Sequence, residues 1–359
     1  FLFAWYIKRI ARAEGIGTMF GFFLSGMVVQ AVIGILQFFV QHDLGLRLLK
    51  ESELGPVLAG VAKISVHGGS AMIRAYGLFP HPNIFAFFLM AALFLLLYLF
   101  LEKNIVEPRS NSNALWQKRT VLFSVGAGIL MFALVLTFSR VALVAYVVFL
   151  SIFFVIVASR AHLKRIQQRN IVCAIALLFV CFFLLILLFR HELSDRLDVL
   201  FDDQSVQLRS YYSTVAEGYI AAHPLFGVGI GHFVASYGET ESPLAYFSRT
   251  LSAENAKSLI GDGMSAGWIY QPVHNVYLLI ASEAGVPSVG ILFAAIVSAI
   301  GVFIKKRHSV SDTEMTEREI FYYIARTTAL FLFLLLLFHG LFDHFFWTSQ
   351  QGRMMAGFI

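Results

Sequence analysis

The chain has 359 residues, of which 58% are hydrophobic and only 14% are charged, and its formal net charge at pH 7 is +5. The apolar residues, including 37 phenylalanines, are gathered in blocks of roughly twenty, the length that a helix needs to cross the hydrocarbon core of a bilayer. This composition excludes a soluble or nucleic-acid-binding protein. It predicts an all-α, polytopic transmembrane helical bundle.

Seven of these blocks are predicted to be membrane spans. In chain order they cover residues 17–40, 83–101, 120–138, 141–158, 170–189, 287–303 and 320–340. The opening "FLFAWYI" reads as the end of an earlier span, and the closing "MMAGFI" reads as the start of a later one. We therefore expect the sequence to be an internal fragment of a longer chain.

The connections between the spans alternate in their content of lysine and arginine. One set holds 15 basic residues in 55 positions: residues 7–16, 102–119, 159–169 and 304–319. The other set holds 11 in 141 positions: residues 41–82, 139–140, 190–273 and 341–353. By the positive-inside rule, the first set is predicted to be cytoplasmic and the second extracytoplasmic.

The first extracytoplasmic connection ends in "IRAYGLFPHPN". Asn83 follows Pro82 at the predicted start of a span, where its side chain can cap the helix. Capping explains Asn83 but not Arg74, which we therefore treat as a candidate ligand-binding residue.

One charged residue, Arg140, lies within the apolar stretch "MFALVLTFSRVALVAYVVFLSIFFVIV". A continuous helix over residues 120–159 would be about 60 Å long, twice the thickness of the hydrocarbon core, so the chain must turn. We place Ser139 and Arg140 at the extracytoplasmic tip of a helical hairpin. Arg140 then either touches lipid phosphate or binds a ligand.

Residues 190–273 form the one long extracytoplasmic connection, and its first part is predicted to be helical. Apolar residues recur there at spacings of three and four, which indicates an amphipathic helix ended by Pro224. The apolar positions are Leu208, Tyr211, Tyr212, Val215, Tyr219 and Ala222. Arg209 lies beside this stripe, either as a solvated surface charge or as a functional residue.

The segment "FGVGIGHF" follows, with glycines at the alternate positions 227, 229 and 231. It has neither a preceding strand nor the GxxxxGK[ST] pattern of a phosphate-binding loop. We expect these glycines to let the backbone approach a neighbouring helix or ligand closely. Residues 238–270 are polar and irregular, which suits a mobile cover.

The long connection ends in "QPVHNVYLLIASEAGVPSVG". This pattern predicts a short helix from about His274 to Gly285, with the next span beginning at Pro287. His274 then lies at a helix N-terminus, where free N–H groups and the helix dipole attract anions, although a histidine there can also be a simple cap. Glu283 is expected to accept a hydrogen bond that fixes the break between the helices.

These features divide the chain into three segments. Residues 1–189 are expected to hold about five transmembrane helices, and residues 190–273 form the extracytoplasmic loop with its amphipathic helix. Residues 274–359 are expected to form a short outer helix and the C-terminal transmembrane helices.

The predicted topology places Arg74, Arg140, Arg209 and His274 on the same side of the membrane. Arginine forks bind phosphate oxygens bidentately, and because nucleotides are not supplied outside the cytoplasm, the natural diphosphate there is one carried on a lipid. Transfer of a sugar from such a lipid needs stabilisation of the departing diphosphate and a base of near-neutral pKa. The arginines are candidates for the first role, and His274 is the candidate for the second.

Four segments, in this order, resemble the bacterial O-antigen ligase and O-antigen polymerase superfamily over about residues 20–350. They are "RAYGLFPHPN", "TFSRVALVA", "LRSYYSTVAEGYIAAHPLFGVGIGHF" and "HNVYLLIASEAGVPSVG". The resemblance implies that Arg140, Arg209 and His274 are the functional trio. Arg74 remains a candidate contact to the diphosphate or glycan because of its predicted position on the same side of the membrane. The C-terminal "LFDHFFWTSQQGRMM" is similar to members from capsule or exopolysaccharide systems.

The resemblance also implies the reaction and its partners. A glycan would be transferred from undecaprenyl diphosphate to an acceptor hydroxyl on a glycan, lipid or protein, with inversion at the sugar and without a metal or other cofactor. The enzyme would be a multi-pass protein of the bacterial inner membrane, in contact with membrane lipid, with its active face extracytoplasmic. Such a reaction belongs to lipopolysaccharide or other polysaccharide biosynthesis for the cell envelope.

Two other functions stay open at this level. A transporter or flippase would bind the same lipid diphosphate during translocation, although the sequence shows no clear internal repeat. A metal-dependent lipid-phosphate glycosyltransferase would need an acidic pair on the outer side, for which Glu51 with Glu53 and Asp202 with Asp203 are the candidates.

Overall fold

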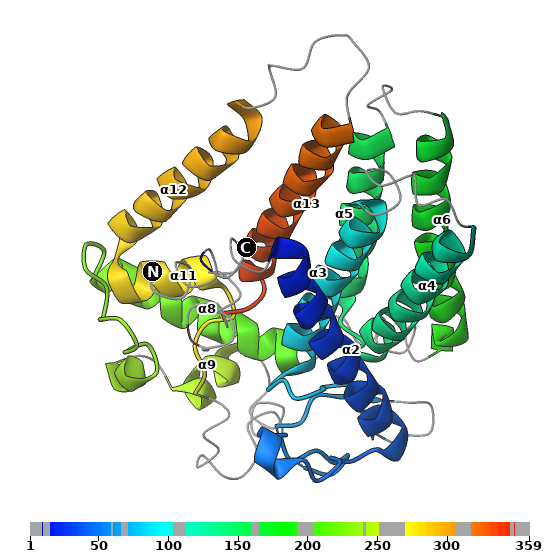
Figure 1. The fold of residues 1–359 in the computed structure, drawn as a ribbon. Helices are drawn as coiled ribbons and strands as arrows, with labels where there is room; N and C mark the ends of the chain where they lie inside the picture. The colour runs from blue at the N-terminus through cyan, green and yellow to red at the C-terminus, as the bar shows by residue number, and fades with distance from the viewer. Residues whose placement is uncertain are drawn as a thin grey trace. The chain divides into compact units, whose positions relative to one another are not determined.

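The structure is a computed structural model, and it is helical in nearly all of its regular elements (Figure 1). It describes residues 15–58, 60–65, 71–102, 113–158, 165–191, 204–239, 242–250, 270–305 and 317–344, together with residues 9 and 348. The predicted all-α, polytopic helical fold is confirmed. The predictions for Asp202 and Asp203, and for most of the proposed cover and the cytoplasmic connections, lie outside these residues.

Contacts divide the chain into two compact units. Unit 1 comprises residues 1–198 and 307–335 with residue 359, and unit 2 comprises residues 199–306 and 336–358. The three segments predicted from the sequence follow the course of the chain across a membrane, whereas these units follow packing. The segment boundaries therefore stay a prediction.

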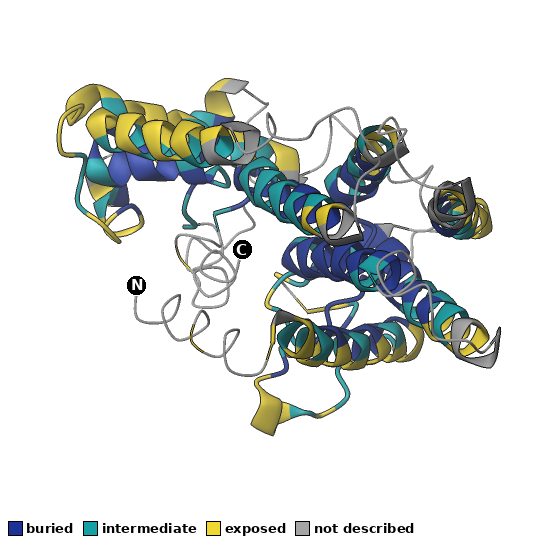
Figure 2. Cartoon of the chain, turned by 45° about the horizontal axis from the view of Figure 1, so that its top comes forward, coloured by how far each residue is buried: buried dark blue, intermediate teal, exposed yellow. Residues whose placement is uncertain are grey.

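Unit 1 is built around helix α3, whose side chains are almost all buried (Figure 2). The helices α2, α4 and α5 contact α3, and α6 packs against α4 and α5. Their bounds are Ile16–Val40 for α2, Pro82–Leu101 for α3, Asn113–Leu136 for α4, Arg140–Ala158 for α5 and Arg165–Leu188 for α6. The first part of α13 (Glu317–Gly340) joins this unit, where Phe331 packs against Phe94 and Phe153.

The predicted spans coincide with apolar helices. Among the residues that the structure describes, four helices are long and apolar enough to cross a membrane: Gly17–Val40, Pro82–Leu101, Gln117–Leu136 and Tyr322–Gly340. Three shorter apolar helices, Arg140–Ile156, Val172–Leu188 and Val286–Gly301, lie at the other predicted spans. Large apolar side chains such as Phe22 on α2 and Ile291 on α12 are exposed, as expected of surfaces that face lipid.

The connection after α2 contains a short 3₁₀ helix η1 (Arg47–Leu49) and two strands, β1 (Lys63–Ser65) and β2 (Ala71–Ile73). The strands pair antiparallel, with Lys63 opposite Ile73. The sequence analysis predicted no strands here, because three-residue segments are too short to show a periodic pattern. Leu54, Ile73 and Tyr76 form a small buried cluster that supports the connection.

Unit 2 contains the helices of the long connection together with α12. The elements are α8 (Gln204–Ala222), η3 (Ala235–Glu239), α9 (Pro243–Thr250), α11 (Val276–Ala284) and α12 (Val286–Lys305). The predicted amphipathic helix is confirmed as α8, whose stripe from Leu208 to Tyr219 packs into an aromatic core with Phe233 and Phe247. Ala222 was wrongly assigned to this stripe, because it lies in the last, exposed turn of the helix.

Candidate functional site

Arg140 is the first residue of α5, directly after a tight turn. Helix α4 ends at Leu136, and the turn over residues 137–139 contains Phe138 at a φ of 46°. The Thr137 hydroxyl donates a hydrogen bond to the Leu134 carbonyl over 2.6 Å, which closes the end of α4. The predicted helical hairpin is confirmed, and Arg140 is half-buried at its tip.

Arg74 lies against the same hairpin tip, in unit 1. Its side chain is only 3% exposed. Its Nε donates to the carbonyl of Thr137, and its Nη2 donates to Oδ1 of Asn83 over 2.7 Å. The backbone N–H of Ala75 adds a hydrogen bond to the Leu136 carbonyl at 2.9 Å. Arg74 thus ties the segment after β2 to the α4–α5 hairpin, a structural role that the sequence analysis did not find.

The expected cap of α3 is wrong by two positions. His81, not Asn83, is the N-cap, and its Nδ1 accepts a hydrogen bond from the backbone N–H of Asn83 at 3.2 Å. The reason is Pro82, whose fixed φ and missing N–H suit the first helical position and so make its predecessor the cap. The side chain of Asn83 instead accepts the hydrogen bond from Arg74.

Within unit 2, helix α8 carries Arg209 and Tyr212, and His274 immediately precedes the N-cap of α11. The cap is Asn275, whose Oδ1 accepts hydrogen bonds from the N–H groups of Tyr277 and Leu278 at 2.9 Å and 3.1 Å. Because Asn275 satisfies the helix end, the His274 side chain is not a cap. Helices α8 and α11 contact each other, which brings residues 65 positions apart in sequence into one site.

The imidazole of His274 lies between two aromatic rings. It stacks on Tyr212 with ring centroids 5.6 Å apart and an interplanar angle of 15°, and it meets the ring of His344 edge-on at 5.0 Å. Its Nδ1 is buried and has no hydrogen-bond partner among the described residues. The ring is therefore packed between Tyr212 and His344, and the backbone of Pro272 also interacts with it.

The surroundings of His274 favour its neutral form. Burial lowers its pKa from the usual 6.5, the neighbouring His344 and Arg209 lower it further, and Asp343 opposes them. Burial likewise lowers the pKa of His344, with Asp343 again opposing. Arg209 acts electrostatically on both histidines and therefore lies near them in unit 2, whereas the predicted topology had placed Arg209 and His274 only on the same side of the membrane.

The sequence analysis missed Asp343 and His344, which follow the end of α13. Asp343 is 5% exposed and accepts a hydrogen bond from the N–H of His344 at 2.7 Å, and Nδ1 of His344 lies 2.8 Å from the Thr348 hydroxyl. The only signal was the pair "DH" directly after an apolar span. Nothing in that pair shows that it packs against a histidine 70 positions earlier.

The glycine segment forms the frame behind His274. Backbone N–H groups of Val228 and Gly229 donate to the carbonyls of Ser282 and Glu283, both at 2.9 Å. The Glu283 carboxylate accepts a hydrogen bond from the N–H of Phe233 at 3.2 Å, consistent with the structural role expected for it.

Two glycines make this close approach possible. A Cβ on Gly227 would lie 2.5 Å from the Ser282 carbonyl oxygen, and one on Gly285 would overlap the Leu225 carbonyl. Both glycines have a positive φ, 64° and 83°. The expectation that glycines allow the backbone to approach a neighbouring helix is confirmed for Gly227, and the break between α11 and α12 falls at Gly285 as predicted.

The described residues contain no group of three or more His, Cys, Asp or Glu side chains placed to hold a metal ion. Of the acidic candidates, Glu51 is buried and accepts hydrogen bonds from Gln37, Leu44 and Leu46. Glu53 forms an exposed ion pair with Arg47 over 3.8 Å. Both carboxylates therefore have structural partners.

One known protein family matches part of this chain. Residues 125–293 match the family model described as O-antigen ligase. This part of the chain is therefore similar to the O-antigen ligase and polymerase superfamily, a family of glycosyl-transferring enzymes. No curated protein and no solved structure matches the chain.

The matched segment contains three of the four residues selected from the sequence: Arg140, Arg209 and His274. Arg209 and His274 both belong to unit 2, whereas Arg140 and Arg74 belong to unit 1. Asp343 and His344 lie beyond the match.

Proposed function

We propose that this O-antigen ligase-type protein transfers a glycan from undecaprenyl diphosphate to an acceptor hydroxyl, as a ligase or a polysaccharide polymerase, on the extracytoplasmic face of the bacterial inner membrane. The observation that carries the proposal is the placement of His274 near an arginine: its ring stacks on Tyr212, its Nδ1 is buried, its pKa is lowered, and Arg209 is one of the groups that lower it. The family match supports the class of reaction. The donor and the roles of the residues are our inference.

In the proposed reaction, His274 accepts the proton of the acceptor hydroxyl. The acceptor oxygen attacks the anomeric carbon, the bond from that carbon to the diphosphate oxygen breaks, and the configuration inverts. A base must be unprotonated before the reaction, which the lowered pKa of His274 provides. An anionic diphosphate beside it would raise that pKa, so donor binding makes His274 a stronger base.

Arg209 is proposed to bind the departing diphosphate. Its guanidinium can form paired hydrogen bonds with phosphate oxygens, and it supplies positive charge where negative charge develops. We propose the same role for Arg140 from the family resemblance and its position at the hairpin tip. Arg74 stays a proposed diphosphate contact too, although its hydrogen bonds to Thr137 and Asn83 favour a positioning role.

The decisive experiment is reconstitution of the purified protein in vesicles with a defined undecaprenyl-diphosphate-linked glycan and each acceptor class in turn: lipid core, lipid-linked glycan and protein hydroxyl. We expect a new glycosidic bond with one class, detected by mass spectrometry of the product. Movement of the lipid-linked glycan across the bilayer without any new bond would instead establish a transporter and overturn the proposal.

A further inference from the structure

The turn formed by residues 47–50, here the Arg47–Lys50 turn, exposes its leucines to an unusual degree. Leu48 is 98% exposed and Leu49 is 57% exposed, whereas Leu54, later in the same connection, is 3% exposed. Single exposed leucines are common on protein surfaces and need no explanation by themselves. Here the residues next to the turn, Asp43 to Leu46 and Glu51 to Leu54, are joined by side-chain hydrogen bonds, and the exposure of two neighbouring leucines needs a reason.

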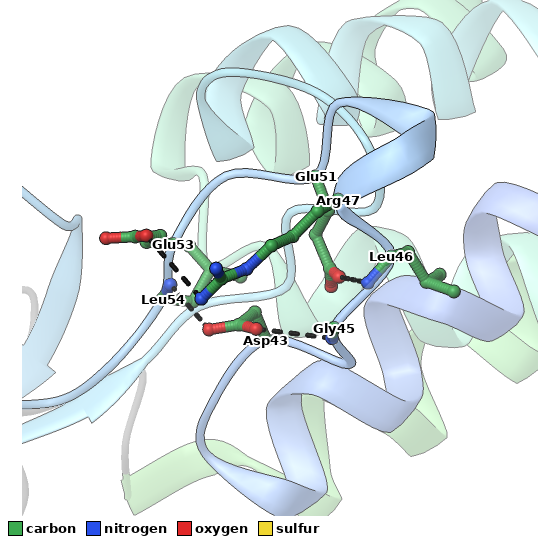
Figure 3. Close-up of polar contacts among 7 residues, drawn as sticks. All are labelled: Asp43, Gly45, Leu46, Arg47, Glu51, Glu53 and Leu54. Carbon is green, nitrogen blue, oxygen red and sulfur yellow. Dashed lines mark hydrogen bonds and ion pairs between the residues drawn. The ribbon is translucent and has the colours of Figure 1, made fainter.

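The turn is fixed by hydrogen bonds to two carboxylates, those of Glu51 and Asp43 (Figure 3). Glu51 Oε1 accepts hydrogen bonds from Nε2 of Gln37 and from the N–H of Leu44, both at 2.8 Å, and its Oε2 accepts one from the N–H of Leu46 at 2.6 Å. Asp43 accepts further hydrogen bonds from the N–H groups of Gly45 and Leu54. A loop with this many internal bonds holds its leucines outward instead of folding them onto the protein.

The contacts of Glu51 also place the turn close to the membrane boundary. The apolar helix Gly17–Val40 is 24 residues long, about 36 Å at 1.5 Å per residue, so its last turn reaches beyond a hydrocarbon core of about 30 Å. Gln37, the partner of Glu51, lies in that last turn. The connection thus folds back onto the end of α2, which we expect to lie at the depth of the lipid headgroups.

The charges on the turn complement a phospholipid surface. Arg47 and Lys50 flank the two leucines, an arrangement in which apolar side chains enter the acyl boundary while the cations meet lipid phosphates. The ion pair of Arg47 with Glu53 leaves both side chains largely exposed, at 80% and 75%. Such a surface pair is weak, so Arg47 can exchange it for a phosphate.

We propose that the Arg47–Lys50 turn is a membrane-dipping element, in which Leu48 and Leu49 insert into the lipid leaflet next to the end of α2. It would fix the depth and tilt of α2 and of the connection that carries Arg74. The proposal is independent of the reaction that the protein catalyses.

The test is site-directed spin labelling of the full chain in vesicles of phosphatidylethanolamine and phosphatidylglycerol. The native cysteines are replaced (Cys173→Ala and Cys181→Ala), and a single label is placed by Leu48→Cys or, as a matched control in the same connection, by Glu53→Cys. We expect the label at 48 to collide more with oxygen than with a water-soluble nickel chelate, and the label at 53 to show the opposite. The paired change Arg47→Glu and Lys50→Glu should move the label at 48 toward water.

Equal exposure of the two labels to the nickel chelate would overturn the proposal. Shielding of the label at 48 from both reagents would also overturn it, because a protein partner or a second copy would then cover the turn. If Leu48→Cys fails to fold, judged by circular dichroism, Leu49→Cys takes its place with the same expected result.

Discussion

Three properties of His274 bear on its proposed role as a general base. Its ring is oriented by Tyr212 and His344, its pKa is lowered by burial, and its Nδ1 has no hydrogen-bond partner among the described residues. A solvated surface histidine would have none of the three. The first predictions therefore concern this residue and its neighbours.

Replacement of the proposed base should nearly abolish transfer. We expect His274→Ala to lower kcat by about 10²- to 10⁴-fold, the usual contribution of general base catalysis. Transfer is measured with purified protein in vesicles. The matched control is His223→Ala, because His223 is an exposed histidine at the end of α8 in the same unit. Wild-type turnover by His274→Ala would eliminate His274 as the base.

The pH dependence should reveal the lowered pKa. Because the folded protein holds the pKa of His274 below 6.5, kcat/KM should stay flat as the pH falls through 6.5 and should decline only at lower pH. His344→Asn removes a neighbour that lowers this pKa, so the decline should begin at a higher pH. An unchanged profile in this variant would show that His344 does not tune the base.

Arginine geometry, not charge alone, should matter at the proposed diphosphate site. We expect Arg140→Ala and Arg209→Ala nearly to abolish transfer, and the corresponding lysine variants also to be impaired, since a lysine cannot reproduce the paired hydrogen bonds. Expression and folding should be preserved. Arg249→Ala on α9 is the control, because Arg249 is exposed. Full activity in Arg140→Lys and Arg209→Lys would show that positive charge alone is sufficient and that the paired hydrogen bonds of arginine are not needed.

At the scale of elements, the frame of unit 2 depends on the close approach of residues 225–229 to the end of α11. The Gly285 backbone N–H donates to the Ala281 carbonyl at 3.0 Å, and the next N–H, of Val286, donates to Pro224 at 2.9 Å. These bonds leave no room for a side chain at Gly285. The break between α11 and α12 therefore requires glycine.

Gly285→Ala should destabilise the protein. Gly285 has φ 83° and ψ 162°, a backbone conformation that costs a residue other than glycine about 1–3 kcal/mol, and overlap with the Leu225 carbonyl adds to that cost. The measurement is thermal unfolding in detergent. Gly290→Ala in α12 is the control, because a Cβ there meets nothing within 4 Å and alanine is the better helix former. Equal melting temperatures of the two variants would contradict the structural role of Gly285.

The α4–α5 hairpin is the second element that the sequence determines locally. Its tip is fixed by span length, since two helices cannot continue as one across a single bilayer. Arg74 and Ala75 then hold the tip from a segment more than sixty positions earlier in sequence. The turn was predictable from the sequence, whereas its support by Arg74 was not.

At the scale of the whole molecule, the metal requirement separates the proposed reaction from its metal-dependent alternative. Glu51 and Glu53 already have hydrogen-bond or ion-pair partners, and the described residues offer no metal-binding group. We expect transfer to continue undiminished in excess EDTA, measured in the reconstituted assay. Loss of activity that Mg²⁺ or Mn²⁺ restores would favour the alternative.

The sequence by itself determined the features that depend on local periodicity and length. The spans, the hairpin tip at Arg140, the amphipathic helix α8 and the short helix ending at Gly285 all follow from apolar spacing, bilayer thickness and breaker residues. The predicted helix cap at Asn83 was wrong because Pro82 prefers the first helical position, which makes His81 the cap; this preference is also local. The order of these segments also carried the resemblance that the family match supports.

Only the tertiary structure decided which side chains meet. It placed Arg209 near His274, added His344 and Asp343 from the end of α13, and turned Arg74 inward to Thr137 and Asn83. These contacts join residues far apart in the chain, and they arise from packing of whole helices, which leaves no periodic trace in the sequence. The pKa of His274 belongs to the same level, because burial and neighbouring charges exist only once the helices have packed.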